Sequence, residues 1–162
     1  MALMFREMRR KNQQVSEADC KNLLREEKRA AFSVLGEHGY PYTIPINFYY
    51  DEGDGKIYFH GSKTGHKADA ISNCTKVCLT VWNQGYKKEG CWEWNATSVV
   101  IFGRVHIVHD PSVVNEKLRK LTTKYYPSKE EVAKAMASPS MNCVQLFAID
   151  IEHMTGKLVN EK

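Results

Sequence analysis

A short β-type run enters a loop and then an expected helix within residues 58–67, YFHGSKTGHK. The loop holds two glycines, a hydroxyl group and two imidazoles, and Lys67 falls in the first turn of the helix. Glycine lets backbone N–H groups approach an anion, a helix N-terminus carries partial positive charge, and the lysine adds a full charge. The segment therefore favours a phosphate site, although it matches neither a Walker loop nor a dinucleotide fingerprint. The alternative interpretation is a polar strand-to-helix loop with solvated lysines.

Length and composition are those of an ordinary globular domain. The chain has 162 residues, 43% of them hydrophobic and 26% charged, so we expect one domain over residues 1–162. Much of the net charge of +4 comes from residues 6–11, within a polar N-terminal arm predicted at residues 1–15. A nucleic-acid binder usually carries a denser basic face, so no nucleic-acid partner is expected.

Cysteine use and hydropathy indicate the compartment. An odd number of cysteines at irregular spacings favours a reducing cytosol over a disulfide framework. These are Cys20, Cys74, Cys78, Cys91 and Cys143. No run approaches the length of a membrane span, and the apolar opening, residues 1–5, is too short for a signal-peptide core. We therefore predict a cytoplasmic protein without a membrane partner.

Periodicity and capping signals predict a mainly β protein. Strands are expected at residues 30–35, 42–50, 56–59, 77–82, 98–109 and 143–151. Helices are expected to start at Ser16, at residues 65–72, after Asp110-Pro111 and at residues 128–137. The strand at 77–82 is apolar on both faces, as inside a barrel or under a subunit interface. Six mostly antiparallel strands, the longest bent at Gly103, suit a small barrel with flanking helices.

Three motifs in the first half of the chain carry a family resemblance: residues 39–48, GYPYTIPINF, residues 55–60, GKIYFH, and residues 65–67, GHK. Residues 8–11, 98–104 and 151–157 add agreement in the right order. The chain resembles the FMN-binding split-barrel superfamily, and within it the nitroimidazole-resistance (Nim-type) branch of the pyridoxamine 5'-phosphate oxidase-like proteins. The resemblance implies a six-stranded antiparallel split barrel and a homodimer with two FMN sites at its interface.

The resemblance also assigns roles to single residues. It places four residues of one strand along the flavin ring: Tyr42, Thr43, Ile44 and Pro45. It places His60, Gly61 and Ser62 at the ring-to-ribityl end, and His66 and Lys67 at the phosphate. Trp94 is a candidate to cover the flavin or substrate, with core or interface packing as the alternative, and Ser98 opens the matched fifth strand.

One departure from the family pattern concerns the phosphate. Many relatives carry Tyr-Arg where this chain has Ala96 and Thr97, and that arginine is a candidate phosphate ligand. Phosphate binding would then depend more heavily on Lys67 and Ser62, or on a basic residue from elsewhere such as Arg104. We therefore expect FMN affinity below that usual for the family.

His60 is the candidate catalytic residue. An imidazole beside a flavin can exchange a proton near neutral pH, and reduction of a nitro group or quinone consumes protons. The alternative is that His60 only packs on the cofactor or hydrogen-bonds to it. No metal site is expected, because Cys74 and Cys78 lack structural-zinc spacing and His106 and His109 lie on opposite faces of a strand.

Together these features predict a homodimeric FMN-dependent oxidoreductase. Its substrates would be nitroimidazole-type or other small electron-poor aromatics, with a reduced nicotinamide or another donor. One alternative is a non-catalytic flavin or haem carrier or sensor of the same fold, and another is a small nucleic-acid-binding barrel. True pyridoxamine-phosphate oxidase activity is disfavoured, because no cluster of basic residues is evident for a second phosphate.

Overall fold

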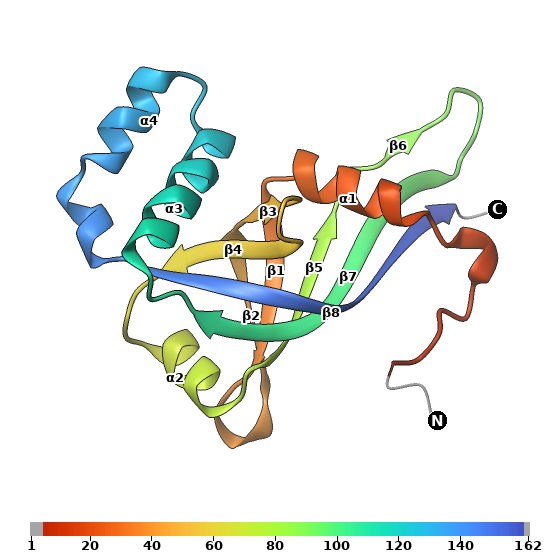
Figure 1. Ribbon diagram of the computed structural model, residues 1–162. Coiled ribbons are helices and arrows are strands. Elements are labelled where there is room, and N and C mark those ends of the chain that lie inside the picture. The colour runs from red at the N-terminus through yellow and green to blue at the C-terminus, as the bar shows by residue number, and fades with distance from the viewer. Residues whose placement is uncertain (1–4, 161–162) are drawn as a thin grey trace.

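The computed structural model describes residues 5–160 and contains one curled antiparallel sheet with helices against it (Figure 1). The sheet has eight strands in the order β2-β1-β5-β7-β8-β4-β3, with β6 paired to β7. The strands are β1 (Arg29–Leu35), β2 (Pro41–Asn47), β3 (Tyr49–Asp51), β4 (Lys56–Gly61), β5 (Lys76–Trp82), β6 (Tyr86–Lys87), β7 (Trp94–Ile107) and β8 (Gln145–Asn160). This half-barrel with flanking helices confirms the predicted fold class.

Four α-helices lie outside the sheet. They are α1 (Glu17–Glu26), α2 (His66–Asn73), α3 (Pro111–Tyr125) and α4 (Lys129–Met136), and 3₁₀ turns occur at Lys11–Gln13, Glu37–Gly39 and Pro139–Cys143. Local capping explains three of the starts: the side chains of Ser16, Asp110 and Ser128 each accept a backbone N–H of the helix they precede. Figure 1 shows α3 and α4 as a hairpin at one end of the molecule, with α2 below it.

The strand predicted at residues 42–50 is two strands, because its backbone is diverted at Phe48. The Phe48 N–H donates to the Tyr125 hydroxyl at 2.8 Å, and that hydroxyl lies 2.8 Å from the Phe48 carbonyl oxygen. A side chain from α3 therefore takes the place of a ladder partner. This break and the two-residue β6, inside the predicted loop 83–93, raise the strand count above the six expected.

The two longest strands extend beyond their predicted bounds. β7 begins at Trp94 rather than Ser98, and β8 continues to Asn160 where a polar tail was expected from residue 152. The extensions pair with each other, with Asn95 opposite Asn160. Gly103 marks the predicted irregularity, a register shift between Phe102 and Gly103. A side chain at Gly103 would collide with the Asp150 carbonyl oxygen.

Apolar side chains divide into two cores. The barrel interior includes fully buried Phe32, Phe48, Phe59 and Phe147, whose rings fill the space inside the curled sheet. A smaller cluster lies between the outer face of the sheet and α3: Tyr58, Leu118, Leu146 and Ala148. Strand β4 separates the cores, because successive side chains of a strand point to opposite faces.

Strand β5 has only one fully buried face within this chain. Val77, Leu79 and Val81 are buried, whereas Trp82 on the other face is exposed. Within one chain, the prediction of burial on both faces is therefore wrong. Burial of that face under a subunit interface stays a prediction.

The segment before α1 is held against the sheet, contrary to the loosely tethered arm expected at residues 1–15. Gln14 bridges to Lys157 of β8, and the Phe5 ring stacks on His153 at a centroid distance of 4.8 Å. Residues 1–4 lie outside the described part of the chain. No helix among residues 5–160 is long and apolar enough to cross a membrane. All five cysteines are free thiols.

Candidate functional site

The end of β4 sends alternate side chains to opposite faces of the sheet. Phe59 is fully buried in the barrel interior, His60 is exposed, and Gly61 faces the same way as Phe59. The ammonium of Lys67 occupies the space where a side chain at Gly61 would lie, since an added Cβ would be 2.5 Å from Lys67 Nζ. Strand alternation therefore separates His60 from Lys67, although the sequence predicted them at one cofactor.

Lys67 is a half-buried cation with no anionic partner in the described chain. Its Nζ lies 5.4 Å from the centroid of the Phe59 ring and 5.9 Å from that of Phe147. Burial lowers the pKa of Lys67, and no carboxylate among residues 5–160 opposes that effect. Cation–π contacts offset only part of the lost hydration. A buried cation without a counterion is costly, so this position favours binding of an anion.

The loop before α2 adds further positive potential. Gly65 is the N-cap of α2 at φ 111°, a conformation suited to glycine, and no side chain caps the helix. The first N–H groups of α2 are thus open to an anion. The Ser62 hydroxyl accepts the Thr64 N–H at 3.2 Å and keeps its own proton to donate. Ser62, Gly65 and Lys67 fit a phosphate group by their chemistry, and a phosphate at this loop stays a prediction.

His66 contributes to a different contact. Its ring is exposed and stacks on Tyr42 of β2, with centroids 4.0 Å apart and an interplanar angle of 22°. Gly36 makes room for the pair, because a Cβ there would be 3.0 Å from Tyr42 Cβ and 3.1 Å from His66 Nε2. His66 therefore links α2 to β2, and the predicted phosphate contact is not part of this arrangement.

Strand β2 presents a free backbone edge. It is terminal in the sheet order and pairs only with β1 among the described strands. Proline has no N–H to donate, so Pro41 and Pro45 must direct that position away from β1. Thr43 has the same parity, which leaves its N–H and carbonyl on the free edge. The four predicted ring residues therefore divide, because Thr43 and Pro45 present their backbone groups to the free edge, whereas those of Tyr42 and Ile44 face β1.

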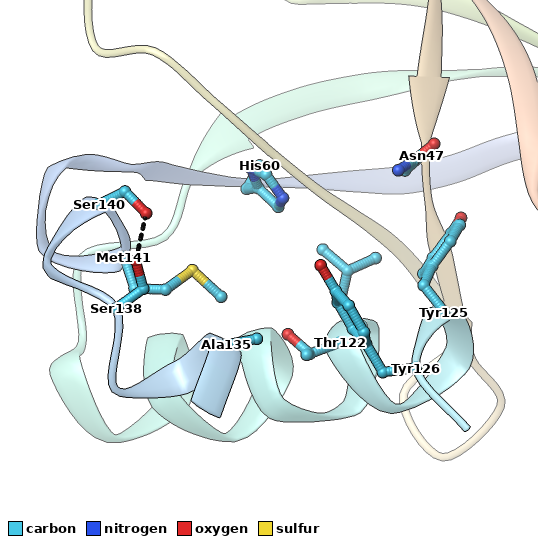
Figure 2. A pocket seen from close by; sticks show the side chains of 10 residues that line it. Asn47, His60, Thr122, Tyr125, Tyr126, Ala135, Ser138, Ser140 and Met141 are labelled. Atoms are coloured by element: carbon cyan, nitrogen blue, oxygen red, sulfur yellow. Dashed lines mark hydrogen bonds between the residues drawn. The ribbon is translucent and has the colours of Figure 1, made fainter. Parts of the chain in front are cut away.

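His60 opens into a cavity of about 540 Å³ beneath the α3–α4 hairpin (Figure 2). We call this space the hairpin cavity; its lining residues are Asn47, His60, Leu121, Thr122, Tyr125, Tyr126, Ala135, Ser138, Ser140 and Met141. In Figure 2 the side chains of His60, Tyr126 and Met141 point toward the same central space. Partial desolvation by these walls, and secondly the charge of Lys67, lower the pKa of His60 below 6.5. The imidazole is therefore neutral at neutral pH.

Asn47 and His60 stand where the barrel splits. The β3–β4 ladder pairs Tyr49 with Tyr58. Asn47, the last residue of β2, lies two residues before Tyr49, and His60 of β4 lies two residues after Tyr58. Beyond them β2 continues on β1 while β4 ends at Gly61. The hairpin cavity thus adjoins the free edge of β2.

Trp94 and Ser98 lie at the other end of the sheet. Trp94 begins β7, near β6, whereas Ile107 at the end of β7 pairs with Phe147, whose ring contacts Lys67 (Figure 1). Ile107 is thirteen steps along the strand from Trp94, about 43 Å of contour at about 3.3 Å per residue. The Trp94 indole N–H donates to the Gln84 carbonyl at 3.2 Å. One chain does not bring Trp94 or Ser98 together with Lys67.

Arg104, the predicted substitute for the family arginine, is engaged elsewhere. Its Nε donates to the Glu152 carboxylate at 2.9 Å, and its Nη1 lies 3.4 Å from the Thr75 hydroxyl. Glu152 belongs to β8, and Thr75 lies between α2 and β5. Arg104 is therefore held by partners within the chain, and a phosphate contact of Lys67 and Ser62 stays a prediction.

Sequence reasoning missed the hairpin cavity. Asn47, Tyr126 and Met141 come from three segments that no local pattern connects. Asn47 is the polar residue that ends an edge strand, which is a usable signal. The residues of the α3–α4 hairpin carry no such signal in the sequence. Helical periodicity predicts which face of a helix is buried, but it does not predict which other segment packs against that face.

Comparison with protein families shows which family the chain belongs to. A family profile for pyridoxamine 5'-phosphate oxidase matches residues 16–158, almost the whole length. The chain belongs to the pyridoxamine 5'-phosphate oxidase-like family. Comparison with curated protein sequences finds no significant match.

Solved structures share the fold at low sequence identity. A proposed 5-nitroimidazole antibiotic resistance protein from Bacteroides thetaiotaomicron is 18% identical with a TM-score of 0.77, over 91% of this chain and 87% of that one. An FAD and haem binding protein from Mycobacterium smegmatis is 21% identical with a TM-score of 0.73, over 93% and 74%. An FAD-binding protein from Mesorhizobium loti is 20% identical with a TM-score of 0.64, over 91% and 97%. These likenesses confirm the split-barrel fold.

Proposed function

We propose that this protein is an FMN-dependent oxidoreductase that reduces small electron-poor aromatic compounds. The observation that carries the proposal is the half-buried ammonium of Lys67, which has no counterion among residues 5–160 and stands beside the uncapped start of α2. Family membership and structural neighbours that bind flavins support a flavin cofactor whose phosphate is the anion bound at Lys67. The cradle provides one lysine and one helix terminus, which suits the single phosphate of FMN.

Each group in the site has a distinct task under this proposal. Lys67, the Ser62 hydroxyl and the N–H groups of α2 hold the phosphate, because charge-assisted hydrogen bonds are the strongest available. The free edge of β2 offers the Thr43 N–H and neighbouring carbonyls to the polar edge of the ring. When bound, the flavin supplies the electron-transfer chemistry, and the protein supplies position and access.

His60 would supply the proton that reduction of an acceptor consumes. Its low pKa means that the protonated form is populated mainly below pH 6.5. Proton delivery from His60 Nδ1 or Nε2 therefore predicts faster acceptor reduction as pH falls. Resemblance to the 5-nitroimidazole resistance structure supports a nitroaromatic acceptor.

We further propose a cytoplasmic homodimer in which two chains build each cofactor site. Trp94 and Ser98 lie too far along β7 to share a cofactor with Lys67 of the same chain. A second copy brings them there if its β6–β7 end meets the α2 end of the first. The exposed rings of Trp82 and Trp94 suit such an interface, and five free thiols suit a reducing compartment.

The decisive experiment records the visible spectrum of the purified protein and identifies the released chromophore by mass. FMN at one per chain, together with oxidation of reduced nicotinamide by a nitroaromatic, supports the proposal. FMN without turnover would indicate the carrier or sensor instead. A protein that stays colourless and monomeric with excess FMN contradicts the proposal altogether.

A mixing experiment tests the shared site. Lys67→Ala and Trp94→Ala chains are each expected to bind FMN poorly. A dimer that combines them has one intact site, so refolding the two together restores FMN binding that neither variant shows alone. If the mixture binds no more than the separate variants, Trp94 does not act across the interface.

A further inference from the structure

The hairpin cavity carries almost no charge at neutral pH. Its lining contains no aspartate, glutamate, lysine or arginine. His60 and Tyr125 are neutral there, since desolvation by the walls and the charge of Lys67 lower the pKa of His60, and burial raises the pKa of Tyr125 to about 12.

Most polar groups of the cavity are already satisfied, and the few that are free define what it binds. The Tyr125 hydroxyl is held by Phe48 and Lys28, and the Thr122 hydroxyl donates to the Leu118 carbonyl at 2.7 Å. The side chains of Asn47, His60 and Tyr126 have no hydrogen-bond partner within residues 5–160, so each is available to a ligand.

The remaining wall is apolar and flexible. Leu121, Ala135 and Met141 supply aliphatic surface, and the ring of Tyr126 supplies an aromatic face. A volume of about 540 Å³ lies in the range of small-molecule pockets, which are mostly apolar with a few convergent polar groups. One or two aromatic rings with a neutral polar substituent fit this description.

We propose that the hairpin cavity is the acceptor-binding pocket and that it selects uncharged aromatic compounds over carboxylated or phosphorylated ones. The inference rests on the proposed oxidoreductase function. Asn47 and Tyr126 select the acceptor through hydrogen bonds between uncharged groups. His60 faces the acceptor and lies where β2 and β4 part. A phosphorylated substrate finds no cation in this lining, which separates the chain from a pyridoxamine-phosphate oxidase despite its family.

Binding without turnover tests the pocket. The probes are 4-nitrobenzamide and 4-nitrobenzoate, which share a ring and differ in charge, titrated into oxidised flavin-loaded protein without an electron donor. We expect the amide to bind about tenfold or more tightly than the carboxylate, because an unpaired charge in such a lining is desolvated without compensation. Equal affinities would overturn the inference.

Filling the cavity gives a second test. Ala135→Phe inserts a ring into the lining and is expected to weaken 4-nitrobenzamide binding about tenfold while flavin content stays unchanged. Ala133→Phe is the matched control, since Ala133 is exposed on the same helix and lies outside the lining. Unchanged affinity in Ala135→Phe would place the acceptor elsewhere.

A charge swap provides a gain-of-function test. Met141→Lys adds an ammonium to the lining and is expected to shift the preference toward 4-nitrobenzoate by about tenfold. Asn142→Lys adds the same charge at an exposed neighbour outside the lining and leaves the preference unchanged. Equal shifts in both variants would mean that surface potential, and not this pocket, sets the preference.

The outcomes separate the pocket from the proposed function. If 4-nitrobenzamide binds and Ala135→Phe weakens it, but no donor supports its reduction, the binding site stands and the oxidoreductase function fails. If reduction proceeds with the same KM in Ala135→Phe, the oxidoreductase function stands and the pocket fails.

Discussion

Lys67 and Lys117 are both withdrawn from water, and their surroundings are opposite. Lys117 is 8% exposed, and its Nζ lies 2.7 Å from Asp51 Oδ2 and 2.9 Å from Asp54 Oδ2. Burial alone would lower its pKa, but the hydrogen bonds to both carboxylates outweigh burial and raise it. For Lys67 burial acts alone and the pKa falls.

The comparison separates a cation that the fold neutralises from one that the described chain leaves without a counterion. The Lys117 group joins α3 to the β3–β4 turn, so its charge is neutralised by the fold itself. Lys67 is neutralised by nothing in the described chain, so its charge is available to a ligand. Burial without a partner is thus the better indicator of a binding site, since a paired cation is explained by structure.

The largest expected effect is on stability, from Lys117→Met. Without Lys117, the Asp51 carboxylate, which is 4% exposed, keeps only Lys120 and the Gly53 N–H as partners, so we expect a loss of about 3 kcal/mol in the free energy of unfolding. Urea denaturation measures it. Lys120→Met is the control, because Lys120 also contacts Asp51 but is 41% exposed and contributes less. A small loss in Lys117→Met would mean that the pair does not hold α3.

The same substitution at Lys67 should act on the ligand and spare the fold. Lys67→Met removes a charge-assisted contact to phosphate worth about 1.5–3 kcal/mol, so FMN affinity falls about tenfold to a hundredfold. The flavin-free protein keeps its free energy of unfolding or gains, because an unpaired half-buried charge is lost. Fluorescence titration with FMN and urea denaturation give the two values. Unchanged affinity would remove Lys67 from the site.

A smaller effect links Lys67 to His60. Because Lys67 is the second cause of the low His60 pKa, Lys67→Met should raise that pKa, while desolvation, the first cause, keeps it below 6.5. The protonated imidazole then persists to a higher pH than in the parent protein. NMR titration of the His60 ring measures this, with Lys117→Met expected to leave the value unchanged. No rise in Lys67→Met would show that the two charges do not interact.

The smallest expected effect comes from Gly61→Ala. The added methyl group would lie 2.5 Å from Lys67 Nζ, the mobile end of a long side chain, so the ammonium moves and the fold does not. We expect FMN affinity to fall a few-fold and the free energy of unfolding to change by less than about 0.5 kcal/mol. Gly103→Ala is expected to lower the free energy of unfolding and to leave FMN affinity unchanged, because its methyl group collides with the Asp150 backbone carbonyl within the sheet.

What the sequence predicted well was local. The strand, loop and helix of residues 58–67 and the caps at Ser16, Asp110 and Ser128 depend on neighbours within a few residues. The break at Phe48 depends on Tyr125, far along the chain, so no local pattern contains it. The length of β8 depends on its pairing with β7.

The candidate site was predictable in composition and not in arrangement. The motif pointed to Lys67, but the absence of an anionic partner for it in the described chain follows only from where the carboxylates of that part lie. His60 and Lys67 are close in sequence, yet the pleat of β4 gives them different faces. The hairpin cavity needed α3 and α4 in place, which periodicity alone does not position.

The Tyr125 hydroxyl connects α3 to the break between β2 and β3 through its hydrogen bonds to Phe48. It fastens the junction between β2 and β3, and the next residue, Tyr126, is part of the hairpin cavity wall. A ligand in the hairpin cavity would therefore contact the residue next to the one that fastens this junction, so its binding is expected to stabilise the β2–β3 break as well as the cavity.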